Sequence, residues 1–413
     1  MFFPDIGGVF SVSPEARPAL LEGRWLGRED GQAIAATGPV STLEGKAQTL
    51  AGLPDWLAWH AESYPEGGAI GFLTYELARI FENVPLCPNN DLPEFSFAFY
   101  PHIERVARGK FPFPCPPSSG SAEILWGFDE AQFIADVERI REYIAAGDIY
   151  QANLTQQFTA RLNGQTPESL YARLSPGQAP LRAYLKVPGI TIVSDSPERF
   201  FHVRGGRVLT SPIKGTIMRG SDPAEDQELR KKLLASNKDR AENVMIVDLL
   251  RNDLGRICHY ETIRARLYEV DTLPHLFHLV SHVEGELRPE AGPLEILRAL
   301  FPCGSITGAP KIHAMEILSE LEPSPRGISM GAIGIILGSP GSTQFEMDFN
   351  VAIRTITVRD DLATFNVGCG IVYDSNPEAE YAEMLLKARP LLEALGLQTR
   401  GERRTPAALT AQG

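Results

Sequence analysis

Cysteine is scarce in this sequence, and long apolar runs are absent. The five cysteines are scattered over 413 residues and form no CxxC pair, which argues against a zinc site or a disulfide framework. No apolar run reaches the length of a membrane span. The first residues, MFFPDI, lack the basic segment that begins a signal peptide. We therefore expect a soluble, cytoplasmic protein that does not bind a membrane.

Acidic residues outnumber basic residues in this chain. The chain has 39 lysines and arginines against 52 acidic residues, for a formal net charge of -13 at pH 7. This balance argues against a nucleic acid or an anionic membrane as partner. A small anionic substrate remains compatible with it, provided that the site supplies local cations. The hydrophobic content of 43% is enough for a sizeable core.

The order of the predicted elements favours an α+β fold. A Pro/Ser/Gly-rich stretch at 111–120 is the best linker candidate. It separates an N-terminal region, residues 1–115, from a larger region, residues 125–397. A polar tail, residues 398–413, is predicted to be disordered. Neighbouring strands are separated by tight turns, which favours antiparallel pairing over a doubly wound sheet.

Apolar periodicity locates the elements. Strands are predicted at 67–75, 191–195, 199–204, 207–211, 332–338, 350–358 and 363–373. Helices are predicted at 129–146, 223–236, 239–254, 293–301, 310–321 and 377–395.

Lys214 is the most informative single residue. It follows the predicted strand 207–211, and Gly215 and Thr216 after it are predicted to form a tight turn with free backbone N–H groups. A lysine held there can lose solvation, and burial disfavours its charged form. The neutral amine is a nucleophile, whereas the ammonium is not. Taken alone, a surface lysine at a strand end is the commoner explanation.

Two acidic pairs stand out near the starts of predicted helices. Asp239 and Glu242 are three residues apart, as are Glu380 and Glu383, so each pair shares a helix face. Two such faces brought together would offer four carboxylates to one hard cation such as Mg²⁺. Either pair alone is more simply explained by the preference of acids for the first helical turn.

Other polar residues interrupt apolar segments. The loop Gly304–Lys311 resembles a phosphate loop but fails the Walker pattern, and Pro310 instead suggests a helix start. Arg354 lies in an otherwise apolar strand pattern and needs an anionic partner. The histidines at 275, 278 and 282 have near-helical spacing, without the pattern of a metalloprotease. The pair Gly368 and Gly370 indicates the close approach of a backbone or a ligand.

Together these segments resemble the chorismate-utilising enzyme family. The resemblance covers about residues 147–395, with a weaker echo at 71–75. It is carried by GDIYQANLTQQF (147–158), SPERFF (196–201), SPIKGT (211–216), KDRAENVMIVDLLRNDLGRI (238–257), FPCGSITGAPK (301–311), AIRT (352–355) and GCGIVYDSNPEAEYAE (368–383). The resemblance implies a large antiparallel β-sandwich with helices on the outside.

The resemblance also implies roles for single residues. Lys214 would attack the ring, and Glu198 would be the general acid/base. The implied metal is Mg²⁺, held directly by Glu242 and Glu383 with Asp239 and Glu380 behind them. The implied substrate contacts are Gln151, Gly215, Thr216, His278, Ser305, Arg354, Gly368 and Gly370.

Two positions separate the activities within this family. Isochorismate and salicylate synthases have a lysine base where this chain has Gln151, and anthranilate synthases generally have alanine at the position of Lys214. The segment PIKGT resembles that of aminodeoxychorismate synthases. This implies amination of chorismate at C4 through a Lys214 adduct at C2, in p-aminobenzoate and folate synthesis. Ammonia would come from a separate glutaminase subunit, because no amidotransferase signature is present.

Two alternatives remain at this point. Anthranilate synthase component I would share the metal site and the fold, and a non-catalytic paralogue would bind chorismate without turnover. The chain also departs from the family at Ser329, where tyrosine is frequent, and at Cys369, where a smaller residue is usual.

Overall fold

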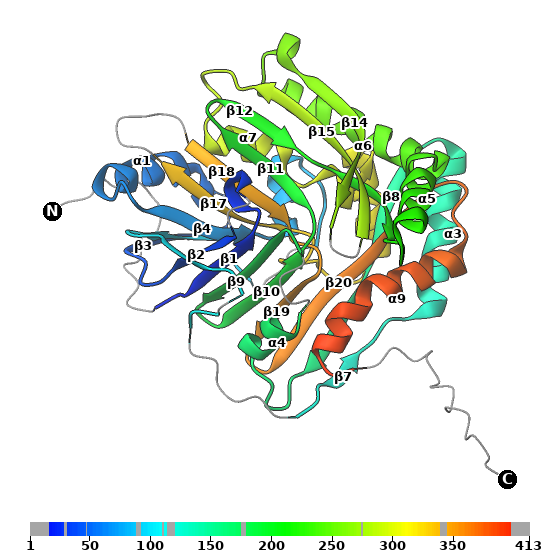
Figure 1. The fold of residues 1–413 in the computed structure, drawn as a ribbon, viewed down its shortest axis with the longest axis horizontal. Helices are drawn as coiled ribbons and strands as arrows, with labels where there is room; N and C mark the ends of the chain where they lie inside the picture. Colours follow the sequence, from blue (N-terminus) through cyan, green and yellow to red (C-terminus); the bar gives the residue numbers. More distant parts are fainter. Residues whose placement is uncertain are drawn as a thin grey trace.

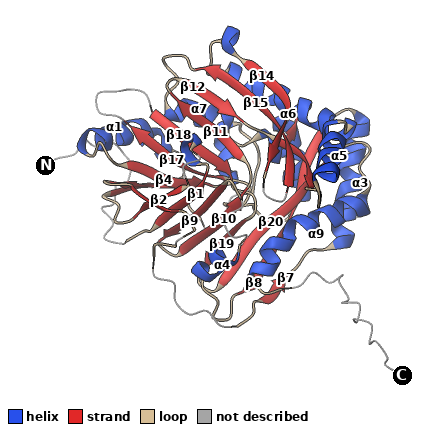
Figure 2. Ribbon diagram, viewed as in Figure 1, coloured by secondary structure: helices blue, strands red, loops and turns tan. Residues whose placement is uncertain are grey.

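The computed structural model describes residues 16–28, 31–46, 48–87, 92–109, 111–113, 120–174, 179–273, 276–338 and 345–397. Two large sheets face each other, and helices cover their outer faces (Figures 1 and 2). Every strand pair in these ranges is antiparallel. The predicted α+β sandwich is thereby confirmed. The predicted tail, and most of the predicted linker, lie outside the described residues.

Sheet A takes strands from the whole length of the chain. Its order is β13 (Ile213–Met218), β15 (Leu276–Glu286), β12 (Arg207–Thr210), β11 (Arg199–Arg204), β18 (Phe345–Val351), β17 (Ala332–Gly338), β4 (Gly68–Leu73), β5 (Phe95–Tyr100) and β3 (Ser41–Gly45), with β14 (Arg264–Thr272) paired to β15.

Sheet B is built in the same way. Its order is β16 (Gly308–Ala309), β8 (Gln151–Arg161), β20 (Leu362–Ile371), β19 (Thr355–Arg359), β10 (Ile190–Ser196), β9 (Leu181–Val187), β1 (Ala19–Gly23), β2 (Gln32–Ala36) and β6 (Glu104–Ala107), with β7 (Glu123–Trp126) paired to β8. The N-terminal strands therefore extend both sheets.

The helices pack on the two outer faces. They are α1 (Leu53–Ser63), α2 (Ala78–Phe81), α3 (Glu130–Ala146), α4 (Pro167–Arg173), α5 (Pro223–Leu234), α6 (Asn237–Gly255), α7 (Pro293–Leu300), α8 (Lys311–Leu321) and α9 (Pro377–Ala394), together with short 3-10 turns at Trp25–Gly27, Thr49–Gly52, Tyr75–Leu77, Tyr260–Thr262 and Gly304–Ile306. None of the helices in the described ranges combines the length and the apolar character that a membrane crossing requires.

Three apolar clusters account for the layers. Helices α1, α6 and α7 pack on the outer face of sheet A, and α3, α4, α8 and α9 pack on the outer face of sheet B. Between the sheets lies a cluster that includes Phe72, Ile192, Ile333 and Ile335. Burial of these side chains is the main favourable term of folding, at about 25 cal/mol for each Å² removed from water.

Local signals place several elements where the sequence predicts them. Helix α3 begins after Asp129, whose side chain accepts from Gln132 N, and ends at Gly147 with φ of 86°. A helix frequently ends on such a left-handed glycine. The predicted strand 350–358 is wrong as a single element: it is broken at Arg354, which has φ of 50° and lies between β18 and β19.

Candidate active site

Lys214 lies on β13, the edge strand of sheet A. The predicted tight turn at Gly215 and Thr216 is wrong, because both residues belong to this strand. The pairing of β13 with β15 shifts register between Ile213 and Thr216, and Gly215 adopts φ of 79° within that irregularity. A Cβ on Gly215 would lie 2.8 Å from Asp239 Cγ, so the strand runs close against α6. A bulge of this kind redirects a side chain without ending the strand.

The Lys214 side chain points into the space between the two sheets. It is 13% exposed, and its Nζ lies 4.0 Å from Glu242 Oε2. A Cβ on Gly370 would come within 3.6 Å of this Nζ and would overlap Gln151 Nε2. Gly370 and Gln151 belong to neighbouring strands of sheet B, β20 and β8. The amine is therefore flanked by an acid from α6 and by the bare backbone of β20.

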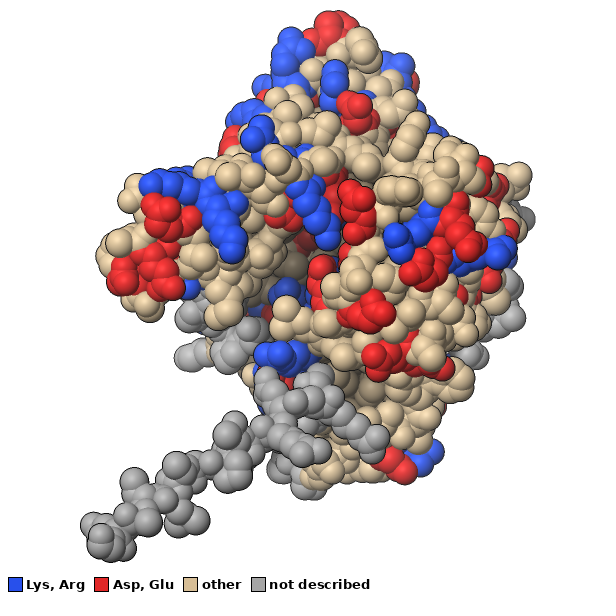
Figure 3. Space-filling view, turned by 90° about the vertical axis from the view of Figure 1, so that its right-hand side faces the viewer, with Lys and Arg blue, Asp and Glu red and all other residues tan. Residues whose placement is uncertain are grey.

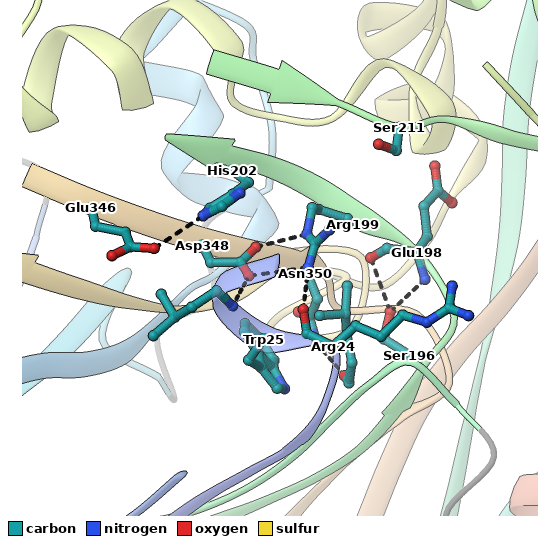
Figure 4. A network of polar contacts seen from close by, with 12 residues as sticks. Arg24, Trp25, Ser196, Glu198, Arg199, His202, Ser211, Glu346, Asp348 and Asn350 are labelled. Carbon is teal, nitrogen blue, oxygen red and sulfur yellow. Dashed lines mark hydrogen bonds and ion pairs between the residues drawn. The ribbon is translucent and has the colours of Figure 1, made fainter. Parts of the chain in front are cut away.

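Glu198 enters the same region from the segment between β10 and β11. Ser196 Oγ donates to Val351 O at 2.6 Å and accepts from Glu198 N at 3.3 Å. Val351 N donates to Glu198 O at 3.0 Å. Figure 4 shows this anchoring network, in which the Glu198 carboxylate points away from Ser196 and towards the segment that carries Ser211. The backbone on both sides of Glu198 is fixed, so its carboxylate has a defined direction.

Burial dominates the chemistry of Glu198. The residue is 5% exposed, and its Oε1 has no hydrogen-bond partner among the residues that the structure describes. Burial raises the pKa of Glu198 to about 7, although hydrogen bonds from Ser305 and the backbone of Ile213 and the charges of Lys214 and Lys387 act against it. A carboxyl group of this kind can hold a proton near neutral pH, as a general acid must.

The acidic pairs lie in the first two turns of α6 and α9, with Asp239 and Glu380 in the first turn, and local caps start both helices just before them. Ser236 Oγ accepts from Asp239 N at 3.3 Å at the start of α6. Asn376 Oδ1 accepts from Ala379 N at 2.8 Å at the start of α9, and Pro377 follows it. These caps fix where both helices begin, and Glu242 of α6 lies 4.0 Å from Lys214 Nζ.

The four carboxylates share cationic neighbours. Glu383 Oε1 pairs with Lys387 Nζ at 2.8 Å, and Glu380 Oε1 pairs with Lys238 Nζ at 3.6 Å. Burial raises the pKa of Glu242, with Lys214 and Lys238 opposing the rise. Burial also works to raise the pKa of Glu383, but Lys387, Lys238 and Lys214 outweigh it, and the net result is a lowered pKa.

This donor set fits a hard divalent cation. It offers carboxylate oxygens from two helices, with Glu380 buried and Glu242 partly buried, and burial of like charges favours a cation that joins them. Among the residues that the structure describes, one group of three potential ligands lies within 4.8 Å, and it consists of Cys369, Glu380 and Glu383. Glu242 does not belong to this group. Burial raises the pKa of the Cys369 thiol to about 12, so it is a poor ligand beside the carboxylates.

His278 lies on a strand, not on a helix. The spacing of the two histidines, four residues apart, suits one face of a strand as well as of a helix, and both belong to β15. Thr216 Oγ1 and His278 Nδ1 are 2.8 Å apart, and His278 Nε2 has no partner in the described part of the chain. Burial, helped by the charge of Arg354, lowers the pKa of His278 to about 4, so the ring is neutral at physiological pH.

Not every predicted residue faces this space. A Cβ on Gly368 would overlap Leu154 O, so the glycine is required by the packing of β20 against β8. Lys311, from the phosphate-like loop, is a buried structural residue: its Nζ donates to Asp253 Oδ2 at 2.6 Å and to Leu300 O at 3.2 Å. The prediction of a helix start at Pro310 is confirmed.

Sequence reasoning missed Lys238 and Lys387. Lys387 Nζ reaches Glu383 and also Gly368 O, at 3.3 Å. Its position four residues after an acid on the same helix is the signal that would have identified it.

Figure 3 shows a hollow near the centre of the face of the molecule that it draws, with basic side chains within the hollow and acidic side chains gathered beside it.

Comparison with known proteins identifies the family. The model of the chorismate binding enzyme family matches residues 25–393. Anthranilate synthase component 1 of Bacillus caldotenax is 36% identical over 81% of this chain and 75% of its own length. Aminodeoxychorismate synthase component 1 of Bacillus subtilis (strain 168) is 35% identical over 80% of this chain and 77% of its own length.

Solved structures share the fold. Anthranilate synthase component I from Streptococcus pneumoniae TIGR4 superposes with a TM-score of 0.70 at 27% identity, over 95% of this chain and 94% of that one. An isochorismate synthase from Bacillus anthracis gives a TM-score of 0.72 at 22% identity, over 93% of this chain and 97% of that one. The match over almost the whole length, in sequence and in structure, shows that this chain belongs to the chorismate binding enzyme family.

Proposed function

We propose that this enzyme aminates chorismate at C4 to give 4-amino-4-deoxychorismate. The observation that carries the proposal is the placement of Lys214, whose Nζ lies 4.0 Å from Glu242 Oε2 and beside the bare backbone of Gly370. A side chain with a nucleophilic nitrogen, inside a cluster suited to a metal ion, is what a covalent route requires.

In the first step, the Lys214 amine attacks C2 of the ring. The two ring double bonds shift away from C2, and the C4–O bond breaks. Glu198, with its pKa of about 7, donates the proton that lets this oxygen leave as water. The Lys214 nitrogen gives up its extra proton, and a secondary amine joins the side chain to C2.

In the second step, ammonia attacks C4 and the electron shift reverses. The C2–N bond breaks, and Lys214 leaves as the free amine after it has taken up a proton. Ammonia is delivered by a separate glutaminase subunit. Gln151 faces the amine where a lysine base would activate water, so the site favours addition of nitrogen over addition of water.

Charge explains why a cation belongs to this site. Chorismate is a dianion, and two carboxylates about 4 Å apart repel each other by about 4 kcal/mol at an effective dielectric constant of about 20. Glu242 and Glu383, with Asp239 and Glu380 beside them, would hold Mg²⁺, which supplies charge neutralisation and orientation for one substrate carboxylate. Arg354, Thr216, His278, Ser305 and the backbone of Gly215 and Gly370 contact the rest of the substrate.

Anthranilate synthesis is the second candidate. Relatives named for it are as similar to this chain as relatives named for aminodeoxychorismate synthesis, at 36% and 35% identity. That reaction aminates C2 and then loses pyruvate. Lys214 beside the substrate space argues against it, since the amine would compete with ammonia for C2.

Product analysis tests the proposal. Purified protein is incubated with chorismate, Mg²⁺ and excess ammonium, and the products are separated by liquid chromatography and identified by mass. Aminodeoxychorismate, which an added lyase converts to p-aminobenzoate, is the expected product. Anthranilate would overturn the assignment, and chorismate binding without turnover would identify a non-catalytic paralogue.

A further inference from the structure

Arg326 is a buried cation in the segment between α8 and β17. Its side chain is 1% exposed, and its Nε and Nη2 donate to the two carboxylate oxygens of Glu322, each at 2.7 Å. Its Nη1 donates at 2.7 Å to Ile306 O, in the 3-10 turn of residues 304–306 (the Ser305 turn). Its Nη2 also donates at 2.7 Å to Asn153 O. Every side-chain nitrogen of Arg326 is thus bound within the chain, so this residue holds parts of the protein together.

The two carbonyls belong to segments that carry predicted site residues. Ile306 directly follows Ser305, whose side chain donates a hydrogen bond to Glu198. Asn153 lies on β8 two residues after Gln151, so their side chains share one face of the strand. The guanidinium therefore connects the Ser305 turn to the strand that carries Gln151.

Further contacts fix the direction of the guanidinium. Glu322 Oε1 accepts from Thr155 N at 2.8 Å and from Thr155 Oγ1 at 3.0 Å, which anchors the carboxylate to β8. The Tyr75 ring centroid lies 4.4 Å from Arg326 Cζ, and the face of the ring attracts the cation. A planar fork held in this way reaches two separate carbonyls at fixed angles, whereas a lysine presents a single nitrogen.

We propose that Arg326 is a positioning residue that holds the Ser305 turn against β8 and thereby keeps the Ser305 hydroxyl on the carboxyl group of Glu198. The backbone also bonds here, from Asn153 N to Thr307 O at 2.7 Å, but that bond lies beyond the end of the turn. Without the guanidinium, Ile306 O would lose a buried partner, and the turn would be free to shift. This inference rests on the proposed function in taking Glu198 as the general acid.

Amide hydrogen exchange tests the positioning without turnover. Exchange is followed by mass spectrometry in the wild type and in Arg326→Lys, which keeps a positive charge beside Glu322. We expect exchange in residues 303–309 to become about tenfold faster in the variant, because the Ser305 turn loses its buried anchor.

The kinetic consequence is measured as a double-mutant cycle with Ser305→Ala. We expect Arg326→Lys to lower kcat for chorismate amination about tenfold to hundredfold, as a misplaced catalytic group does, and to leave the KM for chorismate within about threefold. In the Ser305→Ala background, the same substitution should lower kcat by less than about twofold, because the hydroxyl that Arg326 positions is already absent.

Arg182→Lys is the matched control. Arg182 is also buried, with the Tyr171 ring centroid 4.2 Å from its Cζ, and it donates to Tyr171 O at 2.8 Å and to Leu174 O at 3.1 Å. Both carbonyls lie at the end of α4, so the substitution removes a similar buried fork without touching the Ser305 turn. We expect Arg182→Lys to lower the thermal midpoint, but to leave kcat and exchange in residues 303–309 within about twofold.

A second variant keeps the test decisive if Arg326→Lys does not fold. Arg326→Gln/Glu322→Gln removes both buried charges together and should show the same loss of kcat and the same faster exchange.

The outcomes separate this inference from the proposed function. Unchanged exchange in residues 303–309, or an equal loss of kcat in Arg182→Lys, would overturn the positioning role. A full further loss of kcat in the Ser305→Ala background would also overturn it, because Arg326 would then act without Ser305. If the wild type makes anthranilate, the proposed function fails, whereas exchange and the cycle, followed on that product, still decide the role of Arg326.

Discussion

Two lysines of this molecule are buried in different ways. Lys311 is 6% exposed and is fully engaged, with Asp253 at 2.6 Å and Leu300 O at 3.2 Å. Lys214 is 13% exposed, and in the described residues its ammonium has one ion-pair partner, at 4.0 Å. The first lysine fastens α8 to α6 and α7. The second is held by a single, longer ion pair.

The acidic and amide side chains of the molecule also divide into fully paired groups and groups with an unpaired oxygen. Asp348, which fixes the segment of Glu198, accepts from Arg199 Nε at 2.9 Å and from Leu26 N. Glu198 itself and Gln151 keep buried oxygens without a partner in the residues that the structure describes. An unpaired buried polar group costs about 1 to 3 kcal/mol. The proposed function would explain these two unpaired oxygens as groups kept for the substrate.

The largest effect is expected at Lys214. Lys214→Ala should lower the rate of chorismate amination by about three orders of magnitude or more, since the covalent route is lost. The free energy of unfolding should change by no more than about 1 kcal/mol, because one weak ion pair is removed. Lys214→Arg is the matched control, because it keeps the charge without the nucleophile. Full activity of either variant at saturating ammonium would contradict the covalent role.

Lys311 should behave in the opposite way. Lys311→Ala leaves Asp253 buried without a partner and should reduce the free energy of unfolding by about 3 to 5 kcal/mol. The residual folded protein should keep its affinity for chorismate. Denaturant unfolding and calorimetric binding measure the two quantities. An unchanged unfolding midpoint would contradict the claim that Lys311, unlike Lys214, stabilises the fold.

The ionised carboxylate of Glu198 should lower the stability of the folded protein above neutral pH. Its pKa rises from 4.5 to about 7, so the folded protein binds more protons than the unfolded chain in that window. Stability contributed by the neutral carboxyl is complete below pH 4.5 and is lost as the pH rises through about 7. Glu198→Gln should therefore stabilise the protein at pH 8, by at most about 3 kcal/mol, with little effect at pH 4. Thermal unfolding at both pH values checks this, and equal shifts at both would contradict it.

The smallest effect is expected for the metal. Glu242→Gln should raise the Mg²⁺ concentration needed for half-maximal activity by about 10 to 100 fold, since one proposed ligand loses its charge. The same shift should appear in a metal-binding titration without substrate. Glu76→Gln is a suitable control, because Glu76 is a buried acid that accepts from Arg326 N at 2.7 Å away from the helix starts. Equal metal dependence in both variants would contradict the assignment.

The sequence predicts the parts of the site that have short-range signals. Caps and acidic pairs locate the starts of α6 and α9, and a glycine marks the end of α3. Part of strand β13 was mispredicted as a tight turn, since its irregular pairing with β15 depends on residues about 60 positions later in the chain. Spacing four residues apart also left His278 ambiguous between helix and strand.

Both sheets combine strands that are far apart in the sequence, and this affects folding during synthesis on the ribosome. Strand β1 pairs with β9, about 160 residues later, and β4 pairs with β17, about 265 residues later. The aromatic strand β5, with Phe95, Phe97 and Phe99, is thus synthesised long before β17 and β18 exist to complete its sheet. Such long-range pairing slows folding and leaves apolar edges open in the nascent chain. This enzyme is therefore expected to depend on chaperones during synthesis more than a protein of local contacts would.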